Sequence, residues 1–227
     1  MTALLTLTDV SMQFNREVDA RYAVFGGINV TVDAGECIAL IGRNGSGKST
    51  LLRVMAKIFA PTSGSVSWAP GVAVSLLTLG LGFRPDLSGR DNAYLSCLLM
   101  GLSRDEAAQS LSKIETFCDI GTFFDEPVRS YSAGMRARLG FGTALMNRSQ
   151  VILIDETLSV GDAFFRERAR IALEQEFHAH RAFVLVSHAE QQVERLCNRA
   201  ILLEQGKITA EGHPKAVLAA YADLTAN

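Results

Sequence analysis

A glycine-rich segment directly after an apolar run carries the clearest chemical signal in the chain. The segment reads Gly42-Arg43-Asn44-Gly45-Ser46-Gly47-Lys48-Ser49-Thr50. Its spacing, G-x-x-x-x-G-K-S, is the pattern in which backbone N–H groups surround the phosphates of a nucleoside triphosphate. Glycine is needed because such a loop takes positive φ and brings its backbone against the ligand. The strand predicted before it and the helix predicted after it disfavour a plain glycine-rich turn. The segment therefore predicts a site for ATP or GTP.

Two side chains in this segment add charge and a metal ligand. The helix that opens at Lys48 directs the positive end of its dipole at the phosphates. Lys48 supplies a mobile positive charge for the β and γ phosphates, and the Ser49 hydroxyl suits Mg²⁺. The expected cofactors are therefore ATP and Mg²⁺.

A pair of carboxylates follows the buried strand predicted at Val151 to Ile154. Asp155 is placed to hold Mg²⁺, directly or through water, as the acidic partner of the loop serine. Glu156 lies one peptide further on, points elsewhere, and can orient the attacking water. A helix N-cap gives the same pattern. The pair therefore indicates a metal and nucleotide site only in combination with the phosphate loop.

A second anion-binding helix end is predicted at Tyr131-Ser132-Ala133-Gly134-Met135. Ser132 suits the N-cap position, and Gly134 lies in the first turn. The alternative interpretation is a plain capped helix with no ligand.

Composition excludes several function classes. The 227 residues hold 22 basic and 24 acidic side chains. No basic tract is present, so nucleic acid is not an expected partner. The four cysteines form no C-x-x-C pair and are interpreted as buried reduced thiols. No signal peptide and no apolar stretch of about 20 residues is found, so any membrane role must come through a partner.

The elements that position these motifs indicate an α/β fold. Apolar runs that do not alternate, separated by helices, predict a parallel sheet buried on both faces. Thr6 to Val10 and Ile28 to Val32 alternate and predict half-buried antiparallel strands. From Leu87 to Tyr131, between the two halves of the core, the pattern becomes helical, and Ser103 with Glu106 fits a capping box there. A small helical subdomain is therefore expected as an insertion.

As a whole, the chain resembles the ATP-binding cassette of ABC transporters. Gly42 to Thr50 is similar to the Walker A loop, and Val151 to Glu156 to Walker B. Tyr131 to Met135 is similar to a variant of the L-S-G-G-Q signature. Ser159 to Asp162 matches the D-loop, and Ser187-His188 matches the switch histidine. The resemblance implies one domain over 1–227, a P-loop NTPase core with a RecA-like parallel sheet and an antiparallel β subdomain. The core is expected at 1–86 and 132–227, and the helical subdomain at approximately 87–131.

The same resemblance implies a head-to-tail homodimer with two ATP molecules between the subunits. Ser132 and Gly134 would meet the γ-phosphate bound by the other subunit, and Asp162 would also lie at the nucleotide. Glu156 would polarise water, and His188 would contact the γ-phosphate. Tyr22 is the choice for stacking on adenine, with Phe14 as the rival.

One position departs from the family pattern. Most cassettes carry Gln, and many exporters Glu, where this chain has Thr78. Threonine has a much shorter reach, so Thr78 is not assigned to the metal.

Four phrases resemble the bacterial polysaccharide exporters of capsule, O-antigen and teichoic acid: Leu79 to Phe83, Ser88 to Asn92, Tyr131 to Met135, and Ile154 to Asp162. Arg21 to Phe25 and the end of the chain at Asn227 favour the capsular branch. The resemblance implies an ATPase that powers export of a capsular or other surface polysaccharide across the inner membrane. It would lie on the cytoplasmic face, bound to a separate permease that docks near Phe83 to Leu102.

Two alternatives stay open. The first is the ATPase of an ABC transporter with a different cargo, which would share every catalytic residue. The second is a non-transport cassette in DNA repair or translation. That class is disfavoured because the chain has neither a long coiled coil between its halves nor a second cassette.

Overall fold

The computed structural model describes residues 2–15, 21–77, 82–146, 148–155, 163–177, 181–187 and 189–226. They form two compact units. The first takes in 1–76, 149–156 and 176–227, and the second takes in 77–148 and 157–175. Thr78, Glu156, Asp162 and His188 lie outside the described residues.

The first unit begins with a three-stranded sheet in the order β2-β1-β4. Its strands are β1 Ala3–Asn15, β2 Arg21–Asp33 and β4 Ser63–Trp68. Both neighbours of β1 run antiparallel to it, which confirms the antiparallel strands predicted here. The strands are longer than predicted, and their register brings Phe14 opposite Tyr22.

A six-stranded sheet in the order β5-β6-β7-β3-β8-β9 forms the rest of this unit's framework. Its strands are β3 Cys37–Ile41, β5 Val74–Leu77, β6 Val151–Asp155, β7 Ala182–Val186, β8 Arg199–Glu204 and β9 Lys207–Gly212. The pairs β6–β7, β7–β3 and β3–β8 are parallel. The last pair, β8–β9, is antiparallel and turns at Gln205 and Gly206, which both have positive φ.

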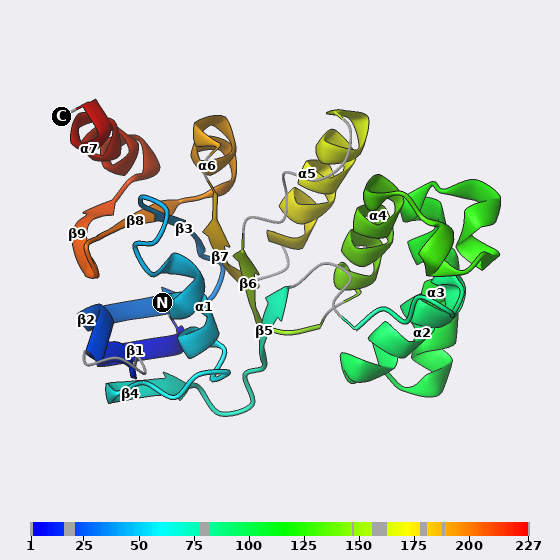
Figure 1. The fold of residues 1–227 in the computed structure, drawn as a ribbon, viewed down its shortest axis with the longest axis horizontal. Coiled ribbons are helices and arrows are strands. Elements are labelled where there is room, and N and C mark those ends of the chain that lie inside the picture. The colour runs from blue at the N-terminus through cyan, green and yellow to red at the C-terminus, as the bar shows by residue number, and fades with distance from the viewer. Residues whose placement is uncertain are drawn as a thin grey trace. The chain divides into compact units, whose positions relative to one another are not determined.

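Helix α1, Lys48–Met55, packs in the core that joins the two sheets of this unit. Ile38 and Leu40 of β3 belong to that core, while Ala39 and Ile41, which point the other way, are also buried. The central strand is therefore covered on both faces, as its unbroken apolar run predicts. Helices α6, Glu190–Leu196, and α7, Pro214–Ala226, lie across the sheet from α1 (Figure 1).

The second unit is helical. It contains α2 Gly89–Leu99, α3 Arg104–Cys118, α4 Ala133–Ala144 and most of α5 Ala163–Phe177, with short 3-10 helices η1 Gly121–Asp125 and η2 Val128–Ser130. The expected subdomain at 87–131 lies within this unit, which also takes in α4 and α5. Stacked and edge-on rings join three of these helices: Phe117 of α3, Phe141 of α4 and Phe165 of α5.

Serine side chains cap three helices of this unit. Ser88, Ser103 and Ser132 each accept a hydrogen bond from the backbone N–H three residues on, at the starts of α2, α3 and α4. Glu106 completes the predicted capping box at Ser103. Among the described residues, no helix is both long and apolar enough to cross a bilayer. All four cysteines are free and buried, as the sequence predicts.

Candidate nucleotide-binding site

The glycine-rich loop connects buried β3 to α1 in the first unit. Two of its glycines are required by the chain's own packing. A Cβ on Gly42, where φ is +151°, would lie 2.1 Å from the backbone oxygen of Leu203 on β8. A Cβ on Gly47, where φ is +105°, would lie 3.0 Å from Cγ1 of Val24 on β2. Gly45 has φ of +82° but open space around it. The folded loop is thus seated against β8 and β2 without help from a ligand.

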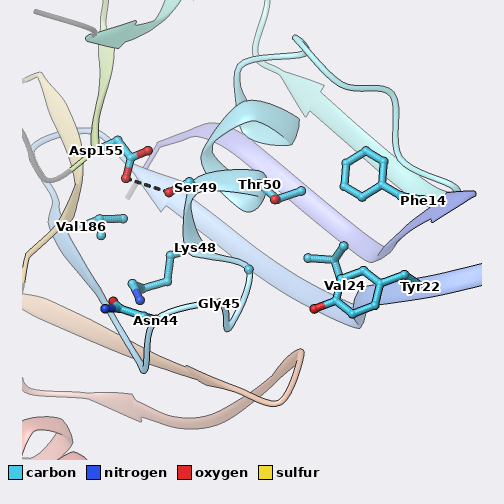
Figure 2. Close-up of a pocket in the computed structure, with 11 residues that line it drawn as sticks. Phe14, Tyr22, Val24, Asn44, Gly45, Lys48, Ser49, Thr50, Asp155 and Val186 are labelled. Atoms are coloured by element: carbon cyan, nitrogen blue, oxygen red, sulfur yellow. Dashed lines mark hydrogen bonds between the residues drawn. The ribbon is translucent and has the colours of Figure 1, made fainter. Parts of the chain in front are cut away.

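A cavity of about 250 Å³ opens over this loop (Figure 2). It is lined by Phe14, Tyr22, Val24, Asn44, Gly45, Gly47, Lys48, Ser49, Thr50, Asp155 and Val186. Most of these are residues predicted from the motifs, and the cavity brings them together. Val24 and Val186 were missed because isolated valines at strand positions carry no motif signal. Phe14 was predicted only as a rival of Tyr22.

Lys48 is buried and bonded to the loop itself. Its Nζ donates to the carbonyl oxygens of Gly42 at 2.7 Å and of Arg43 at 2.8 Å. These bonds hold the ammonium group beside the backbone N–H groups of the loop. A positive charge fixed there favours an anionic ligand.

Ser49 and Asp155 meet at the start of α1 and the end of β6. The serine Oγ donates to Asp155 Oδ1 at 3.0 Å (Figure 2). A hydroxyl beside a carboxylate is a donor set that suits Mg²⁺, which takes its other oxygen ligands from phosphate and water. No cluster of three or more acidic, histidine or cysteine side chains able to hold a metal occurs in the described part of the chain. The hydroxyl of Ser49 and the carboxylate of Asp155 thus fit a metal that brings phosphate ligands with it.

Ser46 is independent evidence that the loop binds a ligand with a hydrogen-bonding group. Its side chain is 7% exposed, and its Oγ is buried without a hydrogen-bond partner. A buried hydroxyl without a partner is costly, since it gives up its bonds to water. A phosphate oxygen in the loop would supply that partner.

Tyr22 and Phe14 form an aromatic border at one end of the cavity (Figure 2). They lie opposite each other on β2 and β1 and are 43% and 38% exposed. The Phe14 ring packs edge-on against Phe59, with centroids 5.8 Å apart. Both rings present enough surface for a planar base.

The predicted second anion site lies in the other unit, at the start of α4. Ser132 is exposed, and its Oγ accepts a hydrogen bond from the Met135 N–H at 3.1 Å. Among the described residues, the nearest atom to a Cβ added at Gly134 is Ser132 Oγ at 3.8 Å, so their packing does not require a glycine there.

Comparison with known proteins places these features in a family. The ABC transporter family model matches residues 25–159, which include the phosphate loop, the start of α4 and the end of β6. The chain belongs to the ABC transporter family.

Several relatives of this ABC protein are named for export. It is 41% identical over 202 residues to the O-antigen export system ATP-binding protein RfbB of Klebsiella pneumoniae, a match that covers 88% of the chain and 81% of the relative. It is 34% identical over 208 residues to the teichoic acids export ATP-binding protein TagH of Shouchella clausii, covering 92% of the chain and 57% of that relative.

A solved structure has the same fold. It is the ATP-binding cassette MJ0796 in a dimeric post-hydrolysis state bound to ADP and Pi, with a TM-score of 0.79 and 19% identity, covering 93% of the chain and 99% of the cassette. This likeness confirms the predicted P-loop NTPase fold. The roles of Glu156, Asp162 and His188 stay predictions, because these residues lie outside the described part of the structure.

Proposed function

We propose that this ABC protein is the ATP-hydrolysing subunit of a transporter that exports a cell-surface polysaccharide across the bacterial inner membrane. The observation that carries the ATPase part is the cavity in which Lys48, Ser49 and Asp155 converge over the glycine loop. The cargo part is supported by two relatives, one named an O-antigen export system ATP-binding protein and the other a teichoic acids export ATP-binding protein.

Within the cavity, Lys48 and the loop N–H groups bind and orient the β and γ phosphates. Ser49 and Asp155 would hold Mg²⁺, which supplies charge neutralisation at the transferring phosphate. Glu156 follows Asp155 by one residue, so it is the proposed base for the attacking water. His188 follows Val186, a cavity residue, by two positions, which supports its proposed contact with the γ-phosphate.

The base is proposed to stack on Tyr22, with Phe14 on the neighbouring strand as the alternative platform. Tyr22 is the more exposed of the two rings, and Phe14 is partly engaged with Phe59. The more exposed ring offers more surface to adenine.

The α4 end is proposed to act on the partner's nucleotide in a homodimer. Ser132 is exposed, and Gly134 adds no side chain at the same helix end. The proposed D-loop residue Asp162 would lie at the same composite site. A site made from two subunits is complete only when the dimer closes, which couples hydrolysis to motion.

The permease is proposed to dock on the segment from Phe83 to Leu102. This segment includes α2, where Leu95 and Leu99 are 40% and 84% exposed and lie one turn apart. Two exposed leucines on one helix face suit a partner helix. Such docking would place the subunit at the cytoplasmic face of the inner membrane.

The capsular type is the narrower form of the proposal, supported by the phrase from Arg21 to Phe25. The alternative is an ABC transporter with a different cargo.

Two variants test the ATPase proposal. Lys48→Ala should abolish hydrolysis and weaken nucleotide binding, because the phosphates lose the cation held at the loop. Glu156→Gln should keep ATP binding, lose hydrolysis and accumulate as a dimer, because an amide cannot accept the proton of the attacking water. Turnover with saturating Mg-ATP and sizing chromatography measure both effects. Wild-type turnover in either variant would contradict the assignment.

A further inference from the structure

Tyr131 is a buried anchor next to an exposed helix end. Its side chain is 4% exposed, while Ser130 and Ser132 on either side are exposed. Between residues 129 and 136 it is the one buried residue. Tyr131 is therefore the buried residue nearest to Ser132 in the sequence.

Three hydrogen bonds fix Tyr131 within the second unit. Its hydroxyl donates to the Phe123 carbonyl oxygen at 2.5 Å. Its backbone N–H donates to the Val128 oxygen at 3.0 Å, and its own carbonyl accepts from Arg136 Nη1 at 2.6 Å. Burial raises the pKa of Tyr131 to about 12, so the hydroxyl remains a donor throughout the physiological pH range.

Gly89, 42 positions earlier in the sequence, leaves space for that hydroxyl because it has no Cβ. A Cβ on Gly89 would lie 2.1 Å from the Tyr131 hydroxyl oxygen and 3.0 Å from the Phe124 carbonyl oxygen. Gly89 does not have a positive φ, and it is the first residue of α2, where glycine is a poor helix former. Space for the tyrosine, and not backbone conformation, thus explains the glycine.

The start of α2 is itself fixed around Gly89. Asn92 is buried, accepts from the Arg84 N–H and donates to the carbonyl oxygens of Arg84, Leu87 and Ser88. Arg90 pairs with Asp125 at 2.6 Å and with Glu115 at 3.1 Å. Asp125 ends η1, the 3-10 helix that includes the Phe123 acceptor. Several hydrogen bonds and two ion pairs therefore surround the tyrosine hydroxyl.

We infer that Tyr131 is the positioning residue for the anion-binding end of α4, and that Gly89 is its steric counterpart. The hydroxyl, seated against Gly89 and bonded to Phe123, holds Ser132 where it meets the partner's γ-phosphate. This inference rests on the proposed function, because that function assigns the γ-phosphate to Ser132. It also gives a physical reason for the two phrases Ser88 to Asn92 and Tyr131 to Met135 to occur together.

The first test replaces the hydroxyl in the full-length chain. Tyr131→Phe should leave the affinity of the monomer for a fluorescent ATP analogue within about twofold and KM unchanged. It should lower kcat about fivefold, the effect of one uncharged hydrogen bond. Tyr221→Phe, the same substitution on α7 of the other unit, should change neither quantity. An unchanged kcat in Tyr131→Phe, even with a lowered melting temperature, would overturn the inference.

The second test examines the steric match. Gly89→Ala should lower kcat about tenfold or more, because the methyl group displaces the tyrosine and with it Ser132. Adding Tyr131→Phe to Gly89→Ala should restore part of kcat, because the atom 2.1 Å away is then gone. Recovery should be incomplete, since the Phe124 oxygen at 3.0 Å remains. A double variant that is less active than Gly89→Ala would overturn the match. Should Gly89→Ala not fold, Tyr131→Phe decides alone.

Ser132→Arg separates this inference from the proposed function. Loss of turnover in Ser132→Arg, with normal kcat in Tyr131→Phe, overturns the positioning role alone. Full turnover in Ser132→Arg overturns the trans-acting site on which the inference depends.

Discussion

The phosphate loop uses neighbouring residues of similar chemistry in different ways. Ser49 is bonded to Asp155, whereas the Ser46 hydroxyl is buried without a partner. Lys48 is buried and satisfied by two loop carbonyl oxygens. Ser46 is therefore a loop side chain that would gain a hydrogen-bond partner from a bound phosphate.

Ser46→Ala should separate stability from nucleotide affinity. Removing an unpaired buried hydroxyl should leave the ATP-free melting temperature equal or higher. The same change should weaken ATP binding about tenfold or more, because a hydrogen bond to a charged phosphate is lost. Thermal unfolding and nucleotide titration measure the two effects. Ser110→Ala, which removes a hydroxyl bonded to the Glu106 carbonyl oxygen of α3, is the control and should leave affinity unchanged. A marked loss of ATP-free stability in Ser46→Ala would show that the hydroxyl has a partner after all.

At the scale of elements, the three serine caps of the helical unit have nearly the same backbone geometry. Ser88, Ser103 and Ser132 have φ near −64° and ψ near 163°. Ser103 and Ser132 were predicted as caps, because a serine before a helical pattern is a local signal, whereas Ser88 was not predicted as one. The additional role proposed for Ser132 depends on what would lie beyond the cap, which no local pattern reports.

A pair of cap variants tests that difference. Ser103→Ala and Ser132→Ala should each lower the free energy of unfolding by roughly 1 kcal/mol, as N-cap losses do. Ser132→Ala should in addition lower ATP turnover at saturating Mg-ATP, while Ser103→Ala should not. Urea unfolding and turnover on the same samples make the comparison. Equal turnover in the two variants would make Ser132 a plain cap, which is the alternative interpretation of its sequence.

The capping box of α3 should make part of the stability depend on pH. Hydrogen bonds from the backbone N–H and hydroxyl of Ser103, followed by one from Arg148, lower the pKa of Glu106 from 4.5 to about 2. The folded pKa lies below the unfolded one, so the stabilisation is complete above the unfolded value and lost as pH falls from about 4.5 toward 2. The difference in urea midpoint between wild type and Glu106→Ala should be constant from pH 8 to 6 and shrink below pH 4.5. A difference that grows on acidification would exclude this origin.

At the scale of the whole molecule, the predictions that succeeded rest on local periodicity and spacing. The apolar run of β3, the loop and the carboxyl end of β6 are each readable within ten residues, and the shared edge of a parallel sheet brings them together. Which helices belong to the helical unit was harder to predict from the sequence. That unit includes α5 through ring contacts such as Phe117 with Phe165, 48 positions apart. The match of Gly89 to Tyr131 is equally long-range, so no local pattern could predict it.

One of the sequence phrases that favour a polysaccharide cargo makes its contacts within the chain itself. In the phrase Ser88 to Asn92, every residue caps, spaces or pairs within the helical unit. These contacts are all internal to the chain, so substitutions in them would not identify the cargo. The cargo must therefore be tested in the cell and not on the isolated subunit.

Deletion of this subunit should stop a surface polysaccharide from reaching the outside, while lipid-linked glycan accumulates within the cell. The reason is that the proposed permease loses its energy source, while synthesis on the cytoplasmic side continues. Surface glycan staining and extraction of lipid-linked glycan measure the two pools. Expression of the wild-type chain should restore export, and expression of Glu156→Gln should not, because it binds ATP without completing a cycle. Normal surface polysaccharide in the deletion strain would refute the glycan cargo in favour of a different one. The ATPase proposal would survive that result, since it depends on the cavity at Lys48, Ser49 and Asp155 and is measured on the purified protein.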